Sequence, residues 1–118
     1  MNQLAFLFGG RDKDFVMAMV VKQTPWHFRQ DFPRWLSENW SIWKRFESEA
    51  HKVYAMGRKH YSARTLIEFL RHETMVREAD GEFKLNNNAA PDLARLYVTL
   101  YPERTGFFDI RVSELRVA

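Results

Sequence analysis

The side chains that could perform catalysis or bind a metal ion are scattered along this sequence. Its four histidines show no i,i+4 spacing, and no acidic residue completes a zinc-protease pattern around them; they are His27, His51, His60 and His72. Acidic candidates such as Glu47 and Glu73 are expected on exposed helix faces, where nothing positions a pair to shift a pKa. The absence of cysteine excludes disulfides and thiolate metal sites. The sequence therefore predicts a non-enzymatic protein with no catalytic residue, metal ion or cofactor.

Positive charge is concentrated in the middle of the chain and favours an anionic partner. The whole sequence carries a net charge of +3, yet residues 41–77 hold eight basic and four acidic side chains, while residues 78–118 hold five and seven. Such a basic block favours contact with nucleic-acid phosphates, although an ordinary solvated helix surface gives the same pattern. The candidate phosphate contacts are Arg58, Lys59, Arg64, Arg71, Arg77 and Lys84.

Helices are expected to position these basic residues. Apolar side chains at Leu66, Ile67 and Leu70 share one face of a predicted helix, and Ser62 has the hydroxyl that an N-cap requires. Gly57 stands where a left-handed residue would end the preceding helix. Helices are predicted at residues 32–38, 41–56, 62–77 and 89–101.

Short strands are expected to complete the fold. Apolar runs at residues 4–8 and 15–21, on either side of a loop that begins at Gly9 and Gly10, predict two short strands. They would form an N-terminal hairpin or arm over residues 1–22, although such runs are equally compatible with buried helix turns. Alternating apolar residues predict two further strands that pair, at residues 82–86 and 107–112. The expected fold is a small single α+β domain with three main helices and a short antiparallel sheet, partly winged-helix-like. Its helical core with short strands spans residues 32–112, and residues 113–118 form a tail.

A cluster of tryptophans offers a second kind of binding surface. Tryptophan is favoured at interface hot spots because it buries a large area with few torsions. Stacking on nucleic-acid bases and completion of the core are alternative uses of the same side chains. The candidate partner-binding residues are Trp26, Trp35 and Trp40. The apolar N-terminus offers a further surface, which a homodimer could bury.

Five short stretches carry a resemblance to known proteins. They are Phe46-Glu-Ser-Glu-Ala, Gly57-Arg-Lys-His-Tyr-Ser-Ala-Arg-Thr, Asn86-Asn-Asn-Ala-Ala-Pro, Ala94-Arg95 and Gly106-Phe-Phe-Asp-Ile-Arg. Over roughly residues 32–111 the chain resembles a family of short uncharacterised bacterial and prophage proteins. The resemblance implies a phage or mobile-element context, and with it a regulator or a phage-encoded inhibitor of a host defence complex, such as an anti-CRISPR protein. It implies no activity and no site residue.

Taken together, these features predict a binding protein of the cytoplasm. No apolar run approaches the roughly 18 residues of a membrane span, and the short run at residues 4–8 follows no cationic residue, so a secretory signal is not expected. The leading expectation is a protein that contacts DNA or RNA through its basic helical face. The alternative is a protein inhibitor or adaptor that docks on a host protein or ribonucleoprotein complex through the tryptophan-rich surface.

Overall fold

The computed structural model describes residues 12–73 and 89–108. Within these residues the chain forms five α-helices and one short 3₁₀ helix, and it contains no strand. The elements are α2 (Lys13–Gln23), α3 (Phe32–Glu38), α4 (Trp40–Ala55), α5 (Ala63–Arg71), α6 (Ala89–Leu100) and η1 (Pro102–Arg104). The β-type pairing in the described part of the chain is one isolated parallel bridge between Tyr61 and Phe108.

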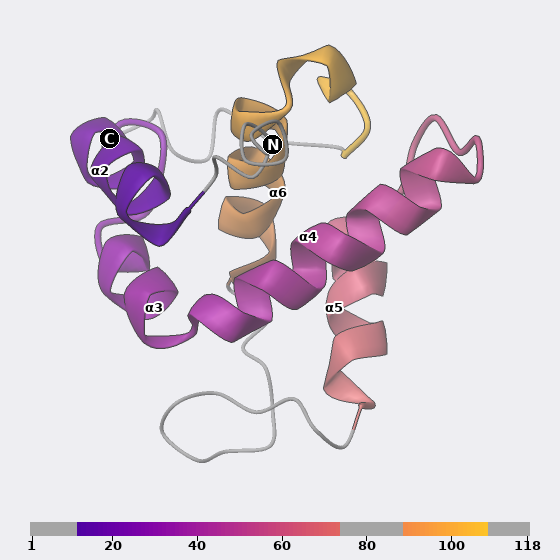
Figure 1. Cartoon of the computed structure of the whole chain (residues 1–118), viewed down its shortest axis with the longest axis horizontal. Helices are drawn as coiled ribbons and strands as arrows, with labels where there is room; N and C mark the ends of the chain where they lie inside the picture. The colour runs from indigo at the N-terminus through magenta and orange to yellow at the C-terminus, as the bar shows by residue number, and fades with distance from the viewer. Residues whose placement is uncertain (1–11, 74–88, 109–118) are drawn as a thin grey trace.

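Helix α4 organises the arrangement. Figure 1 shows it crossing the molecule, with α2 and α3 towards one end and α5 at the other, while α6 lies between these two groups. Helix α4 packs against α3, α5 and α6, and α6 also contacts α5. The core between them is rich in aromatic side chains, and its largest buried members include Phe28, Trp43, Phe46, Tyr97, Phe107 and Phe108.

The helices predicted from apolar spacing are confirmed within one or two residues wherever the structure describes them. The predicted helix at residues 32–38 matches α3. Helix α4 begins and ends one residue earlier than predicted, and α6 ends one residue earlier. Helix α5 begins where Ser62 caps it, because the Ser62 hydroxyl accepts a hydrogen bond from the backbone N–H of Thr65 at 3.1 Å. It ends at Arg71, earlier than predicted, and residues 74–77 of the prediction lie outside the described residues.

The predicted α+β fold class is wrong. Residues 15–21, predicted as a strand, belong to α2, and the described residues form no sheet. The side chain of Asp12 caps α2 by accepting the N–H of Phe15 at 2.9 Å, and Val16 and Val20, one helical turn apart, are both buried. A continuous apolar run carries no alternation that separates helix from strand, so the cap and the core decide its structure.

The predicted short antiparallel sheet and partly winged-helix-like arrangement are also wrong, because residues 12–73 and 89–108 form no sheet. At the start of the strand predicted over residues 107–112, Phe107 and Phe108 lie in an irregular segment, where both side chains are buried. Burial of two consecutive side chains does not fit a strand that exposes one face. The predicted strands at residues 4–8 and 82–86, the tail at 113–118 and the remainder of 107–112 lie outside the described residues.

Helix α6 carries a buried ion pair. The Asp92 Oδ1 atom lies 3.5 Å from Arg95 Nη1 and accepts a hydrogen bond from the backbone N–H of Arg29 at 3.4 Å. Burial raises the pKa of the Asp92 carboxyl to about 6, because desolvation outweighs the Arg29 N–H and the charge of Arg95, which both lower it. Protonation of Asp92 therefore affects the stability of the fold.

Candidate anion-binding site

The connection between α4 and α5, residues 56–62, presents a group of cations to solvent. Gly57 adopts a φ of 92°, a left-handed conformation that costs a residue with a Cβ atom about 1–2 kcal/mol. This conformation ends α4 as predicted and turns the chain outward, so that Arg58 and Lys59 are exposed. Arg64, in the first turn of α5, is also exposed.

A second segment, residues 101–108, lies against this connection. The backbone N–H of Tyr61 donates to the carbonyl oxygen of Phe107 at 2.8 Å, and His60 Nδ1 donates to the carbonyl oxygen of Gly106 at 3.1 Å. Gly106 has a φ of 98°, which turns the chain back after η1. Two segments separated by 46 residues in the sequence are thereby held side by side.

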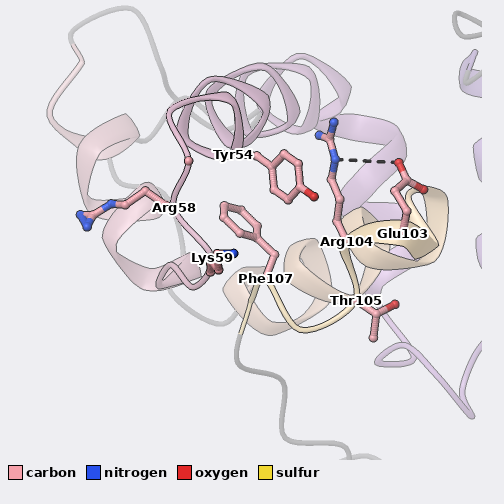
Figure 2. A pocket seen from close by; sticks show the side chains of 8 residues that line it. Tyr54, Arg58, Lys59, Glu103, Arg104, Thr105 and Phe107 are labelled. Atoms are coloured by element: carbon pink, nitrogen blue, oxygen red, sulfur yellow. Dashed lines mark ion pairs between the residues drawn. The ribbon is translucent and has the colours of Figure 1, made fainter.

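A pocket of about 360 Å³ lies between the two segments. Its volume falls at the lower end of the range typical of small-molecule sites, about 300–1,000 Å³. In Figure 2 the rings of Tyr54 and Phe107 occupy its centre, Arg104 and Glu103 stand on one side, and Arg58 extends away from them. The lining residues are Tyr54, Gly57, Arg58, Lys59, Glu103, Arg104, Thr105 and Phe107, which include three cations and one carboxylate.

Arg104 is held in place from behind the pocket. Its Nη1 donates to the hydroxyl of Tyr97 at 2.6 Å and to Nδ1 of His51 at 2.8 Å, and its guanidinium lies 4.0 Å from the ring centroid of Tyr54. A guanidinium has only donors, so His51 must be the neutral tautomer with its lone pair on Nδ1. The Nε atom of Arg104 lies 3.8 Å from a carboxylate oxygen of Glu103, a long contact for an ion pair. Arg104 therefore supplies a positive charge whose position is fixed.

A buried carboxylate continues this polar cluster into the core. Glu47, expected on an exposed face, is only 5 % exposed and accepts a hydrogen bond from the hydroxyl of Tyr101 at 2.6 Å. Tyr101 in turn packs its ring edge against His51, with ring centroids 4.8 Å apart. Burial raises the pKa of the Tyr97 hydroxyl, which accepts the hydrogen bond from Arg104. The cluster supports Arg104 and does not line the pocket.

The six predicted phosphate contacts are placed in three different ways. Arg58 and Lys59 line the pocket, and Arg64 is exposed near it on α5. Arg71 is half-buried and pairs with Glu68 at 2.9 Å. The remaining two, Arg77 and Lys84, lie outside the described residues.

Sequence reasoning missed Arg104, the best-anchored cation of the pocket. It lies in the 3₁₀ helix after Pro102, a turn to which the sequence assigns no partner. Its proximity to Lys59 depends on backbone hydrogen bonds between distant segments, which no local spacing predicts.

The three candidate tryptophans differ in exposure. Trp26, in the turn after α2, is 74 % exposed. Trp35 and Trp40 are half-buried and pack against the core, Trp35 with its ring stacked 6.0 Å from that of Phe32. Trp26 is therefore the member of the set whose indole is free to meet a partner.

The described residues hold neither a cluster of metal ligands nor a helix able to cross a membrane. Across residues 12–73 and 89–108, no three histidine or carboxylate side chains gather closely enough to bind a metal ion. None of the helices described there combines the length and apolar character that crossing a bilayer demands.

Comparison with protein-family models, with curated proteins and with solved structures gave no match. The support for a function therefore comes from the geometry of the pocket and its rim.

Proposed function

We propose that this is a non-enzymatic protein that binds nucleic acid through the cations around the α4–α5 connection. One observation carries the proposal: Arg58, Lys59 and Arg64 are exposed, and none forms an ion pair with a described residue. The exposed cations Arg34 and Lys52 each have a carboxylate partner on their own helix. Lys13, Lys22 and Arg29 are also exposed without an ion pair to a described residue, but none of them lines the pocket. Uncompensated positive charge beside a basic pocket provides a surface for a phosphate backbone.

Several features of this surface suit a flexible strand. The cations lie on a turn and on the first turn of a helix, and the described residues offer no sheet or wing to flank a duplex groove. A single strand can follow the rim from Arg64 to Lys59, because its backbone bends to the protein surface. The partner would be an RNA or single-stranded DNA of the cytoplasm.

The proposal predicts steeply salt-dependent binding. Three phosphate contacts to a single strand give a slope of about −2 in a plot of log K against log salt, so affinity should fall roughly 20-fold between about 50 and 200 mM salt. Replacing two cations in Arg58→Ala/Lys59→Ala leaves one contact and should reduce that fall to about threefold. Fluorescence anisotropy with a labelled single-stranded RNA measures both values.

A matched variant controls for general loss of charge. Arg34→Ala removes another exposed arginine, from α3, which lies far from the α4–α5 connection in Figure 1. This variant should keep the wild-type affinity and salt slope. Absence of binding at low salt, or an unchanged slope in Arg58→Ala/Lys59→Ala, would contradict the proposal.

A second candidate function rests on Trp26. Its indole is 74 % exposed, and Phe15 and Val21 on the preceding helix α2 are each more than half exposed. Large apolar side chains of this kind form the buried centres of protein interfaces. We propose, as the alternative, an inhibitor or adaptor that docks on another protein, or on a second copy of this chain, through these side chains.

The docking alternative has its own test. An affinity purification from host lysate should retain a partner, at low and at high salt, that Trp26→Ala loses, because burial of an indole is insensitive to salt. Replacing Trp26 should leave nucleic-acid affinity unchanged. A partner retained equally by wild type and Trp26→Ala would show that this surface is not the interface.

A further inference from the structure

We infer that the pocket beside Lys59 and Arg104 binds a phosphomonoester, the terminal phosphate of a nucleic-acid strand. This inference rests on the proposed function and specifies which part of the strand enters the pocket. Internal phosphodiesters would lie along the rim towards Arg64, and the end of the strand would enter the cavity.

The charge of the lining favours a dianion. Arg58, Lys59 and Arg104 carry three positive charges, and Glu103 carries one negative charge, which gives the lining a formal charge of +2. A phosphomonoester carries about −1.5 to −2 at neutral pH, whereas each internal phosphodiester carries about −1. The pocket therefore matches the charge of a strand end better than that of the chain between its ends.

The size and lining of the site are compatible with such a group. The pocket of about 360 Å³ is large enough for a terminal phosphate, and Tyr54 and Phe107 are among its lining residues. The buried side chain of Phe107 and the half-buried ring of Tyr54 also limit water on one side, and this strengthens the interaction between a phosphate and the surrounding cations.

The charged side chains of the pocket differ in how firmly the protein holds them before a ligand binds. Arg104 is already fixed by Tyr97 and His51, so little side-chain entropy is lost when a ligand approaches it. Lys59 is exposed and has no ion pair among the described residues, so it is available to close over a bound phosphate. Glu103, 63 % exposed, weakens the field of Arg104 at a distance of 3.8 Å and would oppose an anion.

Two substitutions should therefore act in opposite directions. Lys59→Ala should remove a charge-assisted contact and with it most of the preference for a phosphorylated end. Glu103→Gln should increase that preference, because it raises the formal charge of the lining from +2 to +3 while keeping the size of the side chain. Both side chains are on the surface, so both variants should fold. Arg34→Ala again serves as the control.

The test compares one short single-stranded RNA in two forms, with a 5′-phosphate and with a 5′-hydroxyl. Anisotropy should show about tenfold tighter binding of the phosphorylated form, the worth of one charge-assisted hydrogen bond. The same strand with a 3′-phosphate shows whether either end is accepted. Adenosine monophosphate and adenosine, as competitors, separate a strand end from a free phosphomonoester.

Each outcome decides between the two proposals. Equal, salt-dependent binding of both RNA forms overturns the phosphomonoester inference and leaves the proposed function standing. Direct binding of adenosine monophosphate, measured by calorimetry and abolished in Lys59→Ala, with no binding of either RNA, supports a phosphomonoester pocket and overturns nucleic-acid binding. If neither the RNA forms nor the mononucleotide binds, both proposals are wrong.

Discussion

Replacing Trp43 with alanine is expected to lower the free energy of unfolding by about 3–5 kcal/mol, the usual effect of deleting a buried aromatic side chain. Trp43 lies in α4 with no exposed surface, and its ring stacks 6.2 Å from that of Phe46. Domains of this size are stable by about 5–15 kcal/mol, so this loss is a large share of the total stability. Urea denaturation followed by far-ultraviolet circular dichroism measures the loss without depending on tryptophan fluorescence.

Trp43→Phe provides the matched control for that prediction. The buried Nε1 atom of Trp43 has no hydrogen-bond partner in the described part of the chain. Phenylalanine therefore loses no hydrogen bond and removes an unpaired donor, whose burial costs about 1–3 kcal/mol, while it keeps most of the apolar contacts. Trp43→Phe should lose less than half as much stability as Trp43→Ala. Equal losses in the two variants would show that the indole N–H is bonded.

The second large effect is a dependence of stability on pH that comes from Asp92. Its pKa is about 6 in the fold and 3.8 when exposed, so between these values the folded protein holds a proton that the unfolded chain has released. The contribution of Asp92 to the unfolding free energy therefore falls as the pH rises from 3.8 to about 6, and it is lowest above pH 6. The full difference between the two pKa values corresponds to about 3 kcal/mol of unfolding free energy. About 1 kcal/mol of this is lost as the pH rises from 5 to 7.

Asp92→Asn should remove this dependence, because an amide does not titrate. Urea denaturation at pH 5 and pH 7 should show that the difference in unfolding free energy between wild type and Asp92→Asn changes by about 1 kcal/mol. Asp14→Asn, an exposed aspartate on α2, is the control and should leave the pH dependence as it is in wild type. An identical pH dependence for wild type and Asp92→Asn would show that the Asp92 carboxyl titrates as though it were exposed.

The helices could be predicted because their signals are local. In α5 the apolar residues Leu66, Ile67 and Leu70 are buried as their spacing indicates, and the Ser62 cap lies where its hydroxyl suggests. Helix α2 could not be predicted in the same way, because its apolar residues are continuous and their burial depends on α3 and the rest of the core. The cap at Asp12 was a local signal for a helix start that the hairpin interpretation overlooked.

The candidate site was predicted in part. The basic residues Arg58 and Lys59 were identified from charge alone, and they do line a pocket. The cavity itself depends on the hydrogen bond from Tyr61 to Phe107 and on Arg104, contacts between segments far apart in the sequence. Composition and spacing carry no information about such contacts, so the sequence alone predicts a basic surface and not a cavity.

Amide chemical-shift mapping tests the central claim most directly. Isotope-labelled wild-type protein is titrated at low salt with the 5′-phosphorylated RNA. The largest shifts should fall in residues 57–61 and 103–107, which build the pocket, and Arg34 should be unaffected. Shifts centred on Trp26 and α2, or no shifts at saturating RNA, would contradict a nucleic-acid site at the α4–α5 connection.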